Sequence, residues 1–184
     1  MRANWFVAIP FPLANLEGLL AHLPESCRGF HQEDLHLTVA FLGAMDPVLQ
    51  SAVETAMNRI EAAPVEVTLG NPRALPTRRK PSAFCLELAR GRDRVASWIG
   101  AWRGDLYAAA GSRPDDREPL PHLTIARPRR SQGQLSRSEG LSWLDALRPP
   151  DGVFRLDRLA LFTWASDRRE RLFKRVHEVH FDAG

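Results

Sequence analysis

The sequence contains the pattern His-x-Thr twice, as His36-Leu37-Thr38 and as His122-Leu123-Thr124. In both copies an apolar residue stands between the two polar ones, and more apolar residues follow. Because successive side chains of a strand point to opposite faces, each copy predicts a strand that presents an imidazole and a hydroxyl on one face and buries a leucine on the other. The chain must therefore fold in a way that accommodates two such strands.

Alternation around the first copy predicts a strand over residues 36–41, with Leu37, Val39 and Phe41 on the buried face. The second copy predicts a strand over residues 122–126. Further strands are expected over residues 4–10, 65–69, 83–88, 158–164 and 173–181. Helical spacing predicts long helices over residues 47–62 and 92–110 and short ones over residues 13–23 and 141–147. The proline-containing segment 70–82 and the polar segment 131–140 are expected to be loops.

The two motifs are 122 − 36 = 86 residues apart, and each half of the chain has a motif strand, a long helix and flanking strands. This repetition predicts an internal duplication. We expect an α+β fold in which two antiparallel sheets face each other across a central cleft, with the helices outside and the motif strands side by side at its bottom. The 184 residues would form a single domain of two lobes, each carrying one motif.

The positive charges lie in three clusters, at residues 78–80, 127–130 and 168–175, and nearly all of them are arginine. A guanidinium is planar and matches the geometry of a phosphate, so the clusters are compatible with nucleic acid. A general bias of the composition toward arginine explains them equally well.

Two cysteines, Cys27 and Cys85, are expected to be buried thiols rather than a disulfide. No apolar run approaches the roughly 18 residues that a membrane-spanning helix needs, and the N-terminus lacks the pattern of a signal peptide. We therefore expect a cytoplasmic protein that does not associate with membranes.

Two imidazoles and two hydroxyls around one site suit displacement at phosphorus. One neutral histidine can remove a proton from the attacking oxygen, and one protonated histidine can donate to the departing oxygen. The hydroxyls can stabilise charge on the other phosphate oxygens. Zinc would need a third protein ligand, which neither motif strand offers, so we expect no metal and no cofactor. The remaining histidines, His22, His31, His177 and His180, have no such paired context.

The segments 36–43 and 121–127 resemble the paired signatures of the two-histidine (2H) phosphoesterases, and most closely those of the bacterial and archaeal RNA 2′,3′-cyclic phosphodiesterases, also called 2′-5′ RNA ligases. The resemblance implies a bilobal fold and hydrolysis of RNA ends with a 2′,3′-cyclic phosphate, tRNA fragments among them, to 2′-phosphates. It implies that His36 is the proton donor and His122 the proton acceptor. Thr38, Thr124 and Arg127 would contact the phosphate.

One of these implied roles conflicts with strand periodicity. Strict alternation sends Arg127 to the face opposite His122, so it reaches the phosphate only if the strand twists or ends before it. Arg129 and Arg130 are competing candidates. The sequence also departs from the family's usual pattern, with Phe173 where a tyrosine is common.

Other functions use the same motifs. The site could act on a small cyclic nucleotide or on ADP-ribose cyclic phosphate, or it could bind RNA ends without turnover. Run backwards, with a 5′-hydroxyl in place of water, it would join RNA through a 2′-5′ bond. We expect a monomer.

Overall fold

The computed structural model describes residues 3–182. Its strands are β1 (Trp5–Pro10), β2 (Cys27–Gly29), β3 (His36–Gly43), β4 (Val65–Val67), β5 (Leu69–Leu75), β6 (Ala83–Leu88), β7 (His122–Pro128), β8 (Phe154–Leu156), β9 (Arg158–Trp164) and β10 (Phe173–His180). Its α-helices are α1 (Leu16–Leu19), α2 (Gln50–Met57), α3 (Arg92–Ala109) and α4 (Gly133–Ala146). Short 3-10 turns cover Gln32–Asp34, Pro47–Leu49 and Arg130–Gln132.

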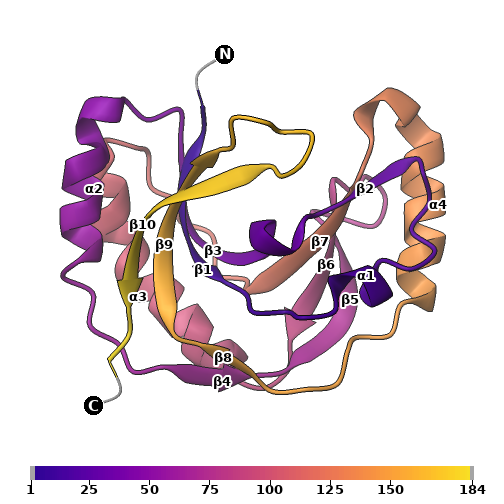
Figure 1. The fold of residues 1–184 in the computed structure, drawn as a ribbon, viewed down its shortest axis with the longest axis horizontal. Helices are drawn as coiled ribbons and strands as arrows, with labels where there is room; N and C mark the ends of the chain where they lie inside the picture. Colours follow the sequence, from indigo (N-terminus) through magenta and orange to yellow (C-terminus); the bar gives the residue numbers. More distant parts are fainter. Residues whose placement is uncertain (1–2, 183–184) are drawn as a thin grey trace.

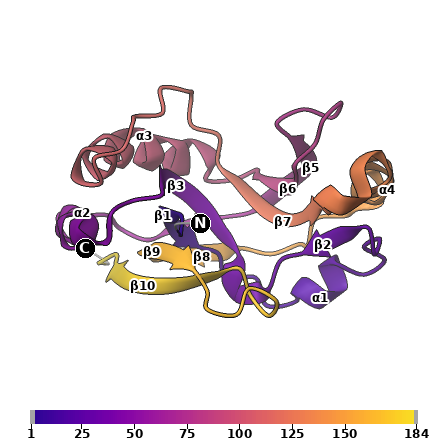
Figure 2. The same cartoon turned by 90° about the horizontal axis from the view of Figure 1, so that it is seen from above.

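Two four-stranded sheets form the framework, with strand orders β10-β9-β1-β3 and β2-β7-β6-β5, and β4 pairs with β8 in a small third sheet. Neighbouring strands run antiparallel throughout these sheets. Each large sheet contains one motif strand, and β3 and β7 approach each other where the two sheets meet (Figures 1 and 2). The predicted α+β fold with two antiparallel sheets is therefore confirmed.

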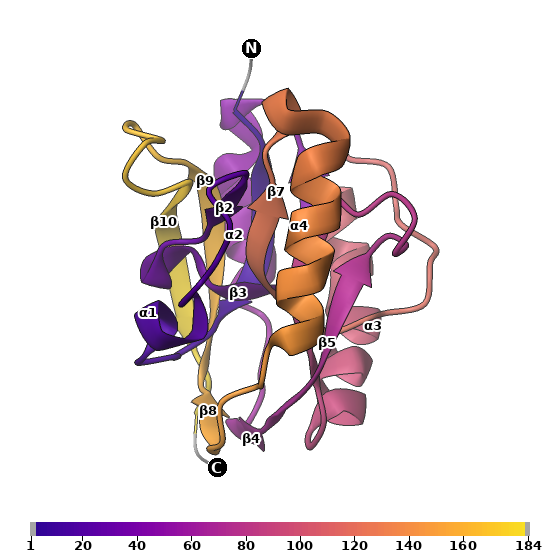
Figure 3. The same ribbon diagram turned by 90° about the vertical axis from the view of Figure 1, so that its right-hand side faces the viewer.

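Helices cover the sheets from opposite sides of the molecule. Helix α3 packs on β3 and α2 packs on α3, whereas α4 packs on β5, β6 and β7 (Figures 1 and 3). Gly140 lets α4 approach its sheet closely, because a Cβ there would overlap the ring of Phe84 and lie 3.0 Å from Cys27 Sγ. Cys27 and Cys85 are both buried and unbridged, as predicted.

The first sheet is apolar on both faces. The main core contains Val7, Ile9 and Leu161, while a separate cluster on the other face consists of Phe6, Ala8, Ala160 and Phe162. Burial on both sides explains why β1 is apolar without alternation. The smaller cluster matters for function because it lies against a motif histidine.

The segment 131–140 is helical, so the predicted loop is wrong. Helix α4 buries Ser136 and Gly140 together with Trp143 and Leu144. The Ser136 hydroxyl donates to the carbonyls of Arg129 and Gly133 at 3.1 and 3.0 Å, which satisfies its polar group inside the fold. A helix whose buried face begins with serine and glycine has no apolar stripe to reveal it.

Other boundaries also differ from expectation. Strand β5 includes Pro72 in a segment predicted as a loop, and it is tolerated because β5 is an edge strand with an irregular register at this point. Helix α1 has a single turn, and α2 ends at Met57 rather than near residue 62. Strands β2 and β8 were not predicted. Within residues 3–182, none of the helices has the length and apolarity needed to cross a membrane.

Candidate active site

Each motif histidine is oriented by the carbonyl group two residues before it. His36 Nδ1 lies 2.6 Å from the oxygen of Asp34, and His122 Nδ1 lies 2.7 Å from the oxygen of Leu120. A carbonyl oxygen only accepts, so Nδ1 must carry the hydrogen in both rings. The same tautomer is thereby fixed twice, and Nε2 of each ring is left for another partner.

Strand β3 contains a bulge directly after its motif threonine. Thr38 and Ala40 pair with successive residues of β1, so Val39 between them has no partner. An extra residue reverses the alternation beyond it. The predicted burial of Phe41 is therefore wrong: it stands on the face of Thr38, and 55% of its surface is exposed.

Strand β7 contains the same bulge at the same place in its motif. Thr124 and Ala126 pair with successive residues of β6, which leaves Ile125 unpaired. The reversal turns Arg127 back to the face of His122, so strict alternation gave the wrong side for this arginine. Its guanidinium lies 5.4 Å from the ring centroid of Phe30.

The site residues predicted from the sequence lie close together. Burial is the main cause that lowers the pKa of His36 and of His122; the nearby charge of Arg127 lowers both further, and that of His122 also lowers the pKa of His36. Thr38 lies half-buried on β3, on the face that it shares with His36. The Thr124 hydroxyl is 3.4 Å from Cys85 Sγ. The two strands thus bring two imidazoles, two hydroxyls and one guanidinium to one place.

Three phenylalanine rings surround His36, and the sequence did not suggest them. The ring centroids of Phe6, Phe162 and Phe173 lie 4.7, 5.5 and 5.6 Å from that of the imidazole. Burial among these rings lowers the pKa of His36 to about 4, against the opposing effect of the hydrogen bond to Asp34. Burial therefore favours the neutral form of His36 at neutral pH.

Charged residues surround His122 instead. Glu87 is its cross-strand neighbour and forms an ion pair with Arg73. Burial is the main cause that lowers the pKa of His122; Arg73 and Arg127 lower it further, while the Leu120 carbonyl and Glu87 raise it. An acidic neighbour is thus available to His122 that His36 does not have.

The carboxylate of Asp34 anchors the aromatic side of the site. It is buried and accepts hydrogen bonds from the backbone N–H groups of Leu172 and Phe173, at 2.7 and 2.9 Å. The same residue accepts the Nδ1 hydrogen of His36 through its carbonyl. Asp34 therefore links the histidine to the start of β10, a role that no sequence pattern indicated.

The competing arginines have different positions. Arg129 donates from Nε to the carbonyls of Glu25 and Cys27, at 2.9 and 3.0 Å, so it fastens the residues around β2 to the end of β7. Of the unpaired histidines, His177 bonds Asn58 and lies outside the site. Over the described part of the chain, no three His, Cys, Asp or Glu side chains are grouped so that they could hold a metal ion.

Comparison with known proteins identifies relatives by sequence. The sequence profile of the 2′-5′ RNA ligase superfamily matches residues 12–168. The chain is 26% identical over 140 residues to the RNA 2′,3′-cyclic phosphodiesterase of Bacillus subtilis (strain 168), covering 69% of this chain and 72% of that protein. It is 28% identical over 137 residues to the RNA 2′,3′-cyclic phosphodiesterase of Geobacillus stearothermophilus, covering 68% of this chain but only 42% of that protein.

Solved structures share the fold over nearly the whole chain. E. coli LigT in complex with 3′-AMP superposes with a TM-score of 0.72 at 19% identity, covering 98% of this chain and 99% of that one. TT0787 of Thermus thermophilus gives a TM-score of 0.68 at 18% identity, covering 97% of both chains. The profile match over residues 12–168 includes both motif strands, and it shows that this chain belongs to the 2′-5′ RNA ligase superfamily, as the resemblance of its motifs predicted.

Proposed function

We propose that this protein is an RNA 2′,3′-cyclic phosphodiesterase, which opens the cyclic phosphate at an RNA end to a 2′-phosphomonoester. His36 and His122 would perform acid-base catalysis without a metal ion. The observation that carries the proposal is the pair of imidazoles fixed in one tautomer by Asp34 and Leu120, each beside a threonine and both near Arg127. The names of the Bacillus and Geobacillus relatives support the substrate class.

In the proposed reaction, Nε2 of His122 takes a proton from water while the water oxygen bonds to phosphorus. The bond from phosphorus to the 3′ oxygen breaks, and Nε2–H of His36 gives its proton to that oxygen. Thr38, Thr124 and Arg127 stabilise charge on the remaining phosphate oxygens. The product carries a 2′-phosphate and a 3′-hydroxyl, and exchange with solvent returns both histidines to their starting states.

The assignment of donor and acceptor follows the family resemblance, and it requires His36 to be protonated when it acts. Burial lowers the pKa of His36 to about 4. A bound phosphodiester brings a negative charge next to the ring, which raises the pKa of an imidazole. Substrate binding would therefore favour the protonated form of the donor.

The same arrangement supports attack by an RNA hydroxyl in place of water. If a 5′-hydroxyl occupies the place of water, His122 removes its proton and the 5′ oxygen bonds to phosphorus, while the bond from phosphorus to the 3′ oxygen breaks and His36 protonates that oxygen. The product then carries a 2′-5′ linkage and a free 3′-hydroxyl. Both reactions use the same two histidines, so one pair of variants tests them together.

The proposal is tested with an oligoribonucleotide that ends in a 2′,3′-cyclic phosphate, incubated in the presence of EDTA and followed by phosphorus NMR. We expect a 2′-phosphate product and a loss of at least about 100-fold in rate for His36→Ala and for His122→Ala. His180→Ala is the matched control, because this histidine is exposed at the end of β10. A 3′-phosphate product, a strict need for metal, or RNA binding without turnover would each refute the proposal.

A further inference from the structure

A pocket of about 500 Å³ lies where β7 ends and α4 begins. Arg127, Arg129, Arg130 and Arg137 contribute to its wall, and no aspartate or glutamate does. Pro81 and Ser82, from the connection into β6, complete it on another side. A concave surface with several guanidinium groups and no carboxylate is suited to an anion.

Two of these arginines are available to a ligand. Arg129 is held by backbone carbonyls, but Arg130 and Arg137 take part in no ion pair within residues 3–182. Burial lowers the pKa of the Arg127 guanidinium, and the nearby charge of Arg130 lowers it further. Like charges gathered without an acid repel one another, and a bound anion would relieve that repulsion.

Arg127 connects the pocket with the candidate active site. It is part of the pocket wall, and its charge also acts on both motif histidines. The cyclic phosphate is the 3′ end of an RNA, so the rest of the chain leaves from the 5′ oxygen of the last nucleoside and carries one phosphate per nucleotide. Because Arg127 belongs to both places, phosphates that precede a cyclic end at His36 and His122 would meet the positive charge of the pocket.

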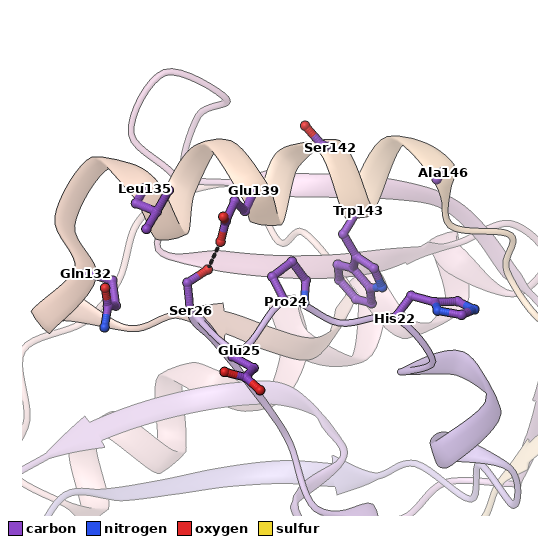
Figure 4. Close-up of a pocket in the computed structure, with 10 residues that line it drawn as sticks. All are labelled: His22, Pro24, Glu25, Ser26, Gln132, Leu135, Glu139, Ser142, Trp143 and Ala146. Atoms are coloured by element: carbon purple, nitrogen blue, oxygen red, sulfur yellow. Dashed lines mark hydrogen bonds between the residues drawn. The ribbon is translucent and has the colours of Figure 1, made fainter.

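Other parts of the surface suit this role less well. A pocket of about 870 Å³ lies between α4 and the segment that precedes β2 (Figure 4), and Glu25 and Glu139 are among its lining residues. The Ser26 hydroxyl donates to Glu139 at 2.5 Å, which fills part of the hydrogen-bonding capacity there. In the other two arginine clusters, Arg78 pairs with Asp145 and Arg171 with Glu33.

We infer that this arginine pocket binds the backbone phosphates that precede the cyclic end of an RNA substrate, so that the protein prefers oligonucleotides to cyclic mononucleotides. The inference rests on the proposed function, because it extends the same site along the substrate. The surface that selects RNA by length would be the end of β7 together with the start of α4.

The test compares kcat/KM for cytidine 2′,3′-cyclic monophosphate with kcat/KM for a trinucleotide that has the same cyclic end. We expect the wild type to prefer the trinucleotide, and the double variant Arg130→Gln/Arg137→Gln to lower that preference by about tenfold at low salt. Each lost phosphate contact should reduce the slope of log affinity against log salt by about 0.7. Arg155→Gln is the control, because it removes one exposed positive charge from β8, a strand that lies away from the start of α4 in Figure 3.

A fluorescein-labelled trinucleotide with a 2′-phosphate measures binding independently of turnover. If the wild type hydrolyses neither substrate, the proposed function fails, whereas weaker binding by the double variant than by Arg155→Gln still supports the pocket. Unchanged binding, an unchanged substrate preference, or a wild type that prefers the mononucleotide would overturn the inference. Thermal melting of each variant shows whether it is folded.

Discussion

The two motif strands share one backbone arrangement and differ in what surrounds it. In β3 and in β7 a carbonyl two residues before the histidine fixes its tautomer, and a bulge follows the threonine. His36, however, lies among three phenylalanine rings, whereas His122 has Glu87 and Arg73 beside it.

The backbone therefore sets the geometry of the two histidines, and the neighbouring side chains set their chemistry. The shared backbone places two equivalent nitrogen atoms toward one substrate, and equivalent atoms alone would give two interchangeable groups. The neighbours make them unequal: burial lowers the pKa of both imidazoles, but the apolar rings around His36 offer no acid, whereas Glu87 opposes the lowering at His122. Experiments that treat the two strands as a matched pair can therefore show which feature determines each role.

The largest expected effect distinguishes the acid from the base. A cyclic substrate with sulfur in place of the 3′ oxygen has a leaving group that needs no protonation. We expect His36→Ala to lose about 1,000-fold in rate on the oxygen substrate and to recover most of it on the sulfur substrate, while His122→Ala stays slow on both. The rates are measured under single-turnover conditions. If His122→Ala recovers instead, His122 is the proton donor and His36 the acceptor. That outcome would agree with the acidic neighbour of His122.

A second comparison concerns the residues that hold the two rings. Asp34→Asn removes a carboxylate that accepts two backbone hydrogen bonds, and the new amide group would face an N–H donor. We expect a loss of about 2–4 kcal/mol in the free energy of unfolding and a melting temperature lower by roughly 5–12 °C.

Leu120→Ala is the matched change on the other strand, since the carbonyl of Leu120 has the same role but its side chain is only half-buried. We expect Leu120→Ala to lower the free energy of unfolding by about 1 kcal/mol. Calorimetry measures this loss in both variants, and equal losses would show that Asp34 does not anchor β10.

A third comparison uses Arg127 and Phe41, which occupy the same place after the two bulges. We expect Arg127→Gln to reduce kcat/KM by about 100-fold, because it removes a donor to the phosphate. Phe41→Leu should stay within about twofold of the wild type. Partial recovery by Arg127→Lys would show that charge is part of the effect, whereas an unaffected Arg127→Gln would remove this arginine from the site.

Apolar runs and helical spacing were sufficient to locate several elements. Strands β6 and β9 and helix α3 lie at the residues predicted for them, and the motif strands carry the expected polar face as far as the threonine. The bulges could not be foreseen, because Val39 and Ile125 are ordinary strand residues and only the pairing with a neighbour reveals the extra position. The first part of helix α4 was missed for a related reason, since Ser136 and Gly140 face its sheet, whereas its second part falls in the short helix predicted over residues 141–147.

The aromatic surroundings of His36 were beyond the reach of the sequence for a topological reason. The three phenylalanines come from β1, β9 and β10, which are far apart in the chain and become neighbours only through the order of the first sheet. The histidines and threonines were identified because a local pattern carries them, and their environments were not, because those depend on strand order.

The smallest expected effect tests whether those rings set the protonation of His36. Phe162→Leu removes one of them while keeping an apolar side chain, so water approaches the imidazole more closely and the pKa of His36 should rise from about 4 toward its ordinary value of 6.5. NMR titration of the imidazole signals measures this, with His122 as the internal control. Because the donor must be protonated, the alkaline limb of the profile of kcat/KM against pH should move upward in the same variant. If the pKa of His36 stayed at about 4 while the fold remained intact, the rings would not be the cause of its low value, and the charges of Arg127 and His122 would have to account for it.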